Sequence, residues 1–408
     1  MKLRNMKKAI VSFCLAAVLA VTELAVTVQP AQAAETFVYE DTDMIGQGGY
    51  IYFIRTNSDS GAASICRKNV SNATVSKVVT ESAGIISLVV NGQYLYYTTA
   101  EDGDWVIKMC RLNGDDARTL CAGTVSYASD SCVYGMETLN NGRTRLFSME
   151  YDADDITVIK SVKANQTLYY VKNIGTDSYY AIYNQKTNKI SLYRLNTTND
   201  RLVRIAVDKR PSNDSTGFLQ VSDLKIVNGE LYYDFGSYEG TGSYWYGSIR
   251  KLTTDGKKKI VAKSTGDDTL TIGTKELYYT TPEGNYYKYQ LSTGKKSKYS
   301  LKLEQNISYT ILGDKTYMAD TSNAKKIVIS RFKSGTNRET LTKNFITISF
   351  KQKKNISYTV DIRQVGIYNL VCVKGTDYSK ASYGWRGKLT SVNWYITDGA
   401  GTLLGSFK

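Results

Sequence analysis

The stretch Asn91-Gly92-Gln93-Tyr94-Leu95-Tyr96-Tyr97-Thr98-Thr99 joins a tight-turn dipeptide to a short aromatic and β-branched run. That combination is typical of a β-strand entered through a turn. Close copies begin at Asn165, Asn228 and Lys275, and weaker copies surround Tyr52, Tyr134, Tyr317 and Tyr368. One strand phrase repeated along the chain indicates a protein built from structural repeats.

Eight tyrosines mark these copies and allow the repeats to be counted: Tyr52, Tyr97, Tyr134, Tyr170, Tyr233, Tyr279, Tyr317 and Tyr368. The intervals between them are 45, 37, 36, 63, 46, 38 and 51 residues. Most match the roughly 40 to 50 residues of one four-stranded propeller blade. The longest interval is expected to hold a long loop around residues 211–217. We also expect Leu95, Leu168, Leu231 and Leu277, which precede the Tyr-Tyr pairs, to occupy equivalent buried positions.

Each repeat contains more than the tyrosine phrase. A second run, such as Ile249-Arg250-Lys251-Leu252, alternates apolar and basic residues and ends in a turn, and a third run returns from it. An apolar stretch precedes the phrase, so four strands emerge per repeat, and no amphipathic helix follows residue 35. Because radial closure removes exposed sheet edges, the sequence predicts an all-β fold: a β-propeller of about seven to eight four-stranded antiparallel blades.

The phrase over residues 277–281, continued by residues 283–294, resembles a degenerate YWTD repeat of low-density-lipoprotein-receptor-type propellers. It is similar, more closely, to tyrosine-rich propeller domains of unknown function found in exported bacterial proteins. The resemblance covers most of residues 46–345 and implies a fold, not an activity. Tyr and Thr mostly replace the Trp and Asp of the YWTD phrase, and receptor-type propellers have six blades, so receptor-like ligand binding is not carried over.

The first 34 residues carry an export pattern. Four basic residues lie within the first eight, an apolar run covers residues 9–28, and Ala31-Gln32-Ala33-Ala34 supplies a small-residue cleavage site. An uncleaved membrane anchor is the alternative, although Glu23 interrupts the apolar run. The sequence thus predicts a secretion signal peptide over residues 1–34 and a single propeller domain over residues 35–408. The protein is expected to be secreted, and extracellular or associated with the cell surface.

Histidine is absent from the whole chain. Catalytic triads that use imidazole and zinc or haem sites that use histidine are therefore excluded. The net charge of +14 suggests attraction to anionic polymers or membrane surfaces, or serves solubility alone. The basic residues form short clusters in hairpins, so nucleic acid is not an expected partner. Cys110 and Cys121 flank the turn at residues 113–116, and they either bridge across it or remain buried thiols.

Carboxylates are the remaining catalytic route, because glycoside hydrolysis needs two of them on either side of the substrate. Three groups qualify: Glu101 with Asp102 and Asp104, Asp152 with Asp154 and Asp155, and Asp267 with Asp268. All lie beside predicted turns, where Asp usually bonds its own backbone. None has the ligand spacing of a calcium loop. No metal, cofactor or catalytic residue is predicted.

Two dense aromatic clusters are the best candidates for a binding site. Most of the 33 tyrosines should pack between blades, but aromatic rings on glycine-rich loops can stack on sugars or dock proteins. The candidate ligand-binding residues are Tyr238, Tyr244, Trp245 and Tyr246 in one loop and Tyr378, Tyr383 and Trp385 in the last repeat.

The sequence therefore predicts a noncatalytic extracellular binding or scaffold propeller of the bacterial cell surface. Its expected partner is an envelope polymer, a glycan or another exported protein. The alternative is an extracellular carbohydrate-active enzyme, a glycoside hydrolase or lyase that uses carboxylates or tyrosine in a central pocket.

Overall fold

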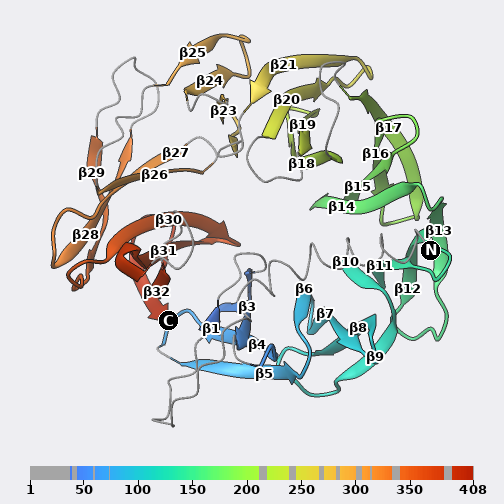
Figure 1. Cartoon of the computed structure of the whole chain (residues 1–408), viewed down its shortest axis with the longest axis horizontal. Helices are drawn as coiled ribbons and strands as arrows, with labels where there is room; N and C mark the ends of the chain where they lie inside the picture. The colour runs from blue at the N-terminus through green and yellow to red at the C-terminus, as the bar shows by residue number, and fades with distance from the viewer. Residues whose placement is uncertain are drawn as a thin grey trace.

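The computed structural model shows eight antiparallel β-sheets arranged in a ring (Figure 1). It describes residues 37–38, 44–57, 60–72, 74–210, 218–238, 245–265, 271–281, 285–299, 306–312, 315–332, 341–380 and 388–407. The predicted propeller of four-stranded blades is confirmed, with eight blades at the upper end of the expected number.

The first four blades follow one another along the chain. Their strands are β2 (Ile45–Gln47), β3 (Tyr50–Asn57), β4 (Ala63–Asn69) and β5 (Val75–Glu81) in blade 1; β6 (Ile85–Asn91), β7 (Tyr94–Glu101), β8 (Asp104–Arg111) and β9 (Arg118–Ala122) in blade 2; β10 (Thr124–Ala128), β11 (Cys132–Thr138), β12 (Thr144–Glu150) and β13 (Thr157–Val162) in blade 3; and β14 (Gln166–Ile174), β15 (Asp177–Asn184), β16 (Lys189–Asn196) and β17 (Arg201–Lys209) in blade 4.

The second half of the ring repeats this order. Its strands are β18 (Phe218–Val227), β19 (Glu230–Tyr238), β20 (Trp245–Leu252) and β21 (Lys258–Thr265) in blade 5; β22 (Thr271–Ile272), β23 (Glu276–Thr280), β24 (Tyr286–Gln290) and β25 (Lys296–Lys298) in blade 6; β26 (Ile307–Leu312), β27 (Lys315–Asp320), β28 (Lys326–Phe332) and β29 (Leu341–Ser349) in blade 7; and β30 (Ser357–Val365), β31 (Tyr368–Asp377), β32 (Lys388–Thr397) and β33 (Leu403–Phe407) in blade 8.

The first strand of each blade lies nearest the centre and the fourth lies toward the rim (Figure 1). Contacts between the first strands of neighbouring blades, such as β6 with β10 and β14 with β18, agree with this order. In blade 1, β2 and the short β1 (Phe37–Val38) share one edge of β3. Among the described strands, none from one end of the chain completes the blade at the other end. Blades 8 and 1 are therefore joined by side-chain packing.

The second strand of each blade carries a repeated register. Its third residue is a tyrosine in seven blades, and a basic third-strand residue often pairs with it, as Arg67 does with Tyr52 and Lys251 with Tyr232. Part of the positive charge thus has a structural role at these cross-strand pairs. These seven tyrosines are Tyr52, Tyr96, Tyr134, Tyr179, Tyr232, Tyr278 and Tyr317.

One expected equivalence is wrong. Leu95, Leu231 and Leu277 are second residues of second strands, but Leu168 and Tyr170 lie on β14, the first strand of blade 4. Leu168 is still buried, with 7% of its surface exposed. The Leu-Tyr-Tyr phrase indicates a buried strand but not its place in the blade, because first and second strands both pack against neighbouring blades. The tyrosine that anchors blade 4 is Tyr179, which shortens the 63-residue interval to the 53 residues between Tyr179 and the equivalent Tyr232. Residues 211–217 lie outside the described part.

Tyrosine rings fill the spaces between blades. Tyr96, Tyr97, Tyr180 and Tyr233 have no exposed surface. Most core clusters contain residues of two adjacent sheets, as where Tyr52 of blade 1 packs with Leu95 of blade 2. Large amphipathic rings suit this role, since they bury much area while the hydroxyl reaches a polar group at the edge of the junction.

Candidate functional site

The topology divides the connections between two faces of the ring. Face A carries the connections between second and third strands and those that lead into the next blade; face B carries the other two kinds. Backbone hydrogen bonds tie neighbouring connections on each face, such as Gln185 N–H to the Asn165 carbonyl on face A and Thr197 N–H to the Thr176 carbonyl on face B. Both aromatic clusters lie on connections of face A.

In blade 5, the aromatic cluster surrounds the connection between β19 and β20. Tyr238 is the last residue of β19 and pairs with Trp245, the first residue of β20, while Tyr246 pairs with Ser237. Trp245 thus begins the third strand of its blade. Tyr244 lies outside the described residues.

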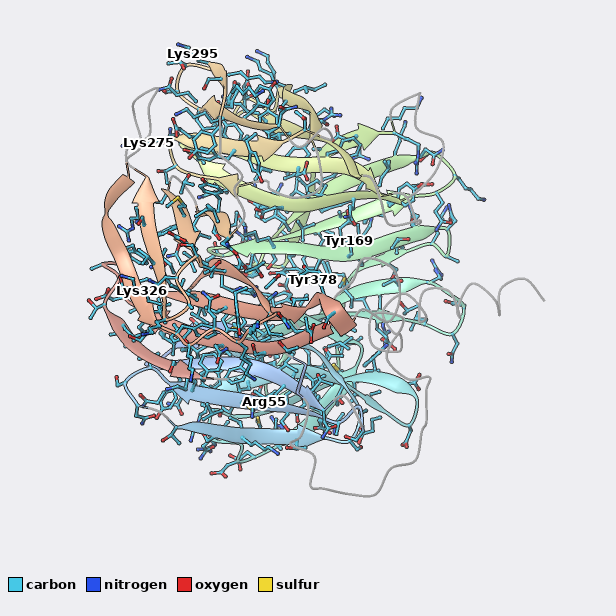
Figure 2. All side chains as sticks on the ribbon, turned by 60° about the vertical axis from the view of Figure 1, so that its left-hand side comes forward. Arg55, Tyr169, Lys275, Lys295, Lys326 and Tyr378 are labelled. Atoms are coloured by element: carbon cyan, nitrogen blue, oxygen red, sulfur yellow. The ribbon has the colours of Figure 1, made fainter. Side chains whose placement is uncertain are left out.

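In blade 8, Tyr378 begins a short 3₁₀ turn, η1 (Tyr378–Lys380), directly after β31 (Figure 2). Its side chain is 57% exposed. The Asp377 carboxylate accepts hydrogen bonds from the Ser379 backbone N–H at 3.0 Å and from its hydroxyl at 2.6 Å, which fixes the turn. Tyr383 and Trp385 lie outside the described residues. The clusters share a face, but blades 6 and 7 stand between them along the ring.

The sequence analysis missed a polar contact between blades 4 and 5. Asp208, on the outermost strand of blade 4, is 3% exposed and accepts a hydrogen bond from the Tyr233 hydroxyl at 2.7 Å. Arg250 lies 3.1 Å and Lys258 2.5 Å from the same carboxylate. A buried carboxylate with two cations and a hydroxyl is a satisfied network. We call Asp208, Tyr233, Arg250 and Lys258 the 4/5 lock.

The junction of blades 1 and 2 has an equivalent arrangement. Glu81 accepts a hydrogen bond from the Tyr97 hydroxyl at 2.8 Å and from the Lys108 ammonium at 3.3 Å. Tyr97 and Tyr233 hold the same strand position, and Lys108 and Arg250 are their cross-strand partners. We call Glu81, Tyr97 and Lys108 the 1/2 lock. Both locks share a sequence signal: a carboxylate near the end of the fourth strand of one blade, followed by a Tyr-Tyr pair on the second strand of the next blade.

The tyrosines of the locks are held neutral. Burial raises the pKa of Tyr97 and Tyr233 well above the ordinary 10.0, and the carboxylate beside each raises it further. They are therefore hydrogen-bond donors at neutral pH, and neither is suited to act as the base of a lyase.

The candidate carboxylates do not converge in the described part of the chain. Glu101 and Asp104 flank the two-residue turn Asp102-Gly103, in which Asp102 has a φ of +51° and Gly103 of +91°. Asp152, Asp154 and Asp155 are exposed on the connection between β12 and β13, on face B. Asp267 and Asp268 lie outside the described residues. No group of three metal-ligating side chains occurs among the residues that are described.

The structure decides between a disulfide bridge and buried thiols for Cys110 and Cys121. Cys110 and Cys121 are free thiols on β8 and β9, and Cys121 pairs with Ile107 rather than with Cys110. Burial raises the pKa of both thiols to about 11. They are packed, protonated side chains at neutral pH.

The inner strands carry polar contacts from blade to blade. Lys172 of β14 forms an ion pair with Asp223 of β18 at 2.6 Å. Thr310 of β26 donates a hydrogen bond to Asp361 of β30 at 3.3 Å. These partly exposed groups join first strands of neighbouring blades, so their role in the fold is to tie the ring together at its inner edge.

Comparisons with known proteins define the fold alone. No family model and no curated protein matched the chain. Among solved structures, a prolyl endopeptidase superposes with a TM-score of 0.50 at 11% identity, over 84% of this chain and 55% of that one. BamB from Moraxella catarrhalis gives 0.48 at 11% identity, over 84% and 96% of the two chains. Oligopeptidase B from Leishmania major gives 0.49 at 8% identity, over 82% and 53%. This chain spans about half the length of the two peptidases.

The likeness to the prolyl endopeptidase concerns the fold alone. Within the described part of the chain, no helix is long and apolar enough to cross a membrane.

Proposed function

We propose that this chain is an exported, noncatalytic binding or scaffold propeller whose ligand surface is face A. Its ligand is an envelope polymer, a glycan or another exported protein. The observation that carries this proposal is the common position of the two aromatic clusters, since Tyr238 to Trp245 and Tyr378 bracket long second-to-third connections on one face. Tyr378, at 57% exposure, is an aromatic ring available for stacking.

Three sequence features support the same proposal. The basic start, apolar run and small-residue site of residues 1–34 are typical of an export signal that is removed from the mature protein. The absence of histidine removes the most common general base. The described carboxylate groups lie at separate hairpin turns, an arrangement that favours a binding protein over a glycoside hydrolase.

A glycan array probed with residues 35–408 tests the proposal. We expect a hit whose binding weakens by more than about fivefold in Tyr378→Ala and in Trp245→Ala, because losing a central ring typically costs more than about 1 kcal/mol of binding. Ile367→Ala is the control, since Ile367 is 79% exposed on face B of the same blade as Tyr378. Equal weakening by all three variants, or folded variants that bind normally, would remove face A as the ligand surface.

A further inference from the structure

At the junction of blades 3 and 4, the fourth-position tyrosine of the second strand, Tyr180, shares a hydrogen bond with the Ser126 hydroxyl at 2.9 Å. The two locks show a second way to satisfy a tyrosine at this position. In both, the hydroxyl of that tyrosine donates to a carboxylate from the outermost strand of the preceding blade. A cation from the tyrosine's own blade neutralises the carboxylate. Blade 6 also has such a tyrosine, Tyr279, whose side chain is 1% exposed.

Strand register identifies the residue that should supply the carboxylate to Tyr279. In blades 1, 4 and 5, the anchor tyrosine of the second strand pairs with one residue of the third strand. In blades 1 and 4, the carboxylate of the fourth strand pairs with the third-strand residue that comes four positions earlier in the sequence. The residue at that place in blade 5 is a threonine. The three residues, with their third-strand partners, are Glu81 with Ala63, Asp208 with Ile190 and Thr265 with Gly247.

One cation of the 4/5 lock has an equivalent in blade 6, although the cross-strand partner of Tyr279 is Tyr287, where the locks carry Lys108 or Arg250. Lys258, which binds Asp208, pairs with Leu252 on the third strand, and Lys296 pairs with Tyr289 at the same place. The Lys296 ammonium lies 4.2 Å from the centroid of the Tyr287 ring and 5.4 Å from that of Tyr279. In the described part of the chain, Lys296 forms no ion pair with a carboxylate.

Two hydroxyls at this junction are left without a partner. The Tyr279 hydroxyl and the Thr281 Oγ1 are both buried and make no hydrogen bond among the described residues. In blade 2, the equivalent Tyr97 donates to Glu81, and Thr99 donates to the Gly84 carbonyl at 3.1 Å. Buried polar groups almost always have partners, so two orphaned donors beside a cation indicate a missing acceptor.

We propose that the junction of blades 5 and 6 is an anion-binding site that takes a carboxylate or phosphate group of a ligand in place of the carboxylate that the 1/2 and 4/5 locks carry. Tyr279 donates a hydrogen bond to the anion, Thr281 supplies a second hydroxyl, and Lys296 supplies the charge. The site is independent of whether the aromatic connections bind a glycan, although Thr281 lies at the face A end of β23.

The first test measures thermal unfolding of the full mature chain in sodium acetate and in sodium phosphate, against sodium chloride at equal ionic strength. Because an anion that binds only the folded state stabilises it, we expect a rise in Tm on the order of 2 °C. A response to acetate alone assigns a carboxylate ligand, and a response to phosphate alone or to both assigns a phosphate or a general anion site. A Tm that matches the chloride value in both salts overturns the proposal.

A matched pair of variants makes the test specific to this junction. Thr265→Asp should supply the missing carboxylate, raise the Tm in chloride and abolish the response to the added anion. Asp208→Thr should have the reverse effect, a lower Tm in chloride that acetate or phosphate partly restores. Lys296→Ala should fold and lose the response. An anion response that survives both Thr265→Asp and Lys296→Ala places the bound anion elsewhere and overturns the proposal.

Asp267 and Asp268 follow Thr265 in the sequence, so one further variant is needed. If Asp267→Asn with Asp268→Asn gains an anion response that the unmodified chain lacks, the chain supplies its own carboxylate and the junction is a third lock. If the double variant responds as the unmodified chain does, the anion site stands. Glycan-array binding through Tyr378 is read separately, so failure of one proposal leaves the other intact.

Discussion

Two junctions of the ring are held together by different physical means. Between blades 8 and 1, the contact is apolar: the Phe407 ring of blade 8 stacks on Phe53 of blade 1 at 4.9 Å between centroids and, within its own blade, on Trp394 at 6.1 Å. Between blades 4 and 5, the 4/5 lock surrounds one buried carboxylate. The closure depends on packing, whereas the lock depends on protonation and hydrogen bonding.

The difference follows from connectivity. Blades 4 and 5 are adjacent along the chain, so a polar contact needs only to set their angle. Blades 8 and 1 have no such covalent link, and closing the ring costs conformational entropy that buried apolar area must offset. Close backbone approach adds to the fit, since a Cβ on Gly46 would lie 2.9 Å from the Val365 carbonyl oxygen. Apolar packing therefore suits the contact between blades 8 and 1, which no direct chain connection holds together.

Alkaline pH should give the largest effect and act on the buried tyrosines, which include those of the two locks. The pKa of Tyr97 and of Tyr233 is raised by burial and by the adjacent carboxylate. Their stabilising contribution is therefore complete below the unfolded pKa of 10.0 and is lost as pH rises through the folded value. Each should cost about 1.4 kcal/mol per pH unit between pH 10 and its folded pKa.

We expect tyrosinate absorbance and near-ultraviolet circular dichroism to change together in one steep step above about pH 10. Tyr233→Phe should make the fall in stability with pH shallower, because one raised group is gone. A gradual titration of all tyrosines near pH 10 with the fold intact would show that the locks do not hold their hydroxyls neutral.

Trp394→Ala should give the next largest effect, at the closure. Trp394 has no exposed surface and packs in one cluster with Phe53 and Phe407. Removing the indole should lower the free energy of unfolding in urea by about 3 to 5 kcal/mol. Leu403→Ala, in the same blade but 49% exposed, should change it by less than about 0.5 kcal/mol. A similar small loss in both variants would show that the ring does not depend on this contact.

These junctions also show where sequence reasoning succeeds and stops. The strand phrases report burial and period, so the all-β class, the four-stranded repeat and the propeller followed from the sequence. The same phrase on β14 misplaced the blade 4 anchor, because Leu168 is buried on a first strand as Leu95 is on a second. The locks join residues such as Glu81 and Tyr97 whose relation is set by register and blade packing, which no single segment encodes.

The candidate site divides in the same way. Aromatic density around Trp245 and Tyr378 singled out two stretches as loops, since glycine-rich stretches between strand phrases favour loops. That both are second-to-third connections of one face follows from the strand order alone. Whether two such loops meet depends on how many blades separate them. Orphaned donors such as the Tyr279 hydroxyl emerge only when equivalent blades are superposed, because the sequence alone shows a tyrosine in each.

The smallest effect should come from removing one oxygen at two equivalent positions. The Tyr233 hydroxyl donates to Asp208 at 2.7 Å, and hydrogen bonds to charged groups contribute about 1.5 to 3 kcal/mol, so Tyr233→Phe should lower stability by that amount. Tyr279→Phe should leave stability in chloride buffer unchanged or slightly raised, because the buried hydroxyl has no partner among the described residues. Denaturant midpoints at unchanged slope give both values. Equal losses of stability in the two variants would mean that the Tyr279 hydroxyl already has an acceptor. The junction of blades 5 and 6 would then not differ from the 4/5 lock.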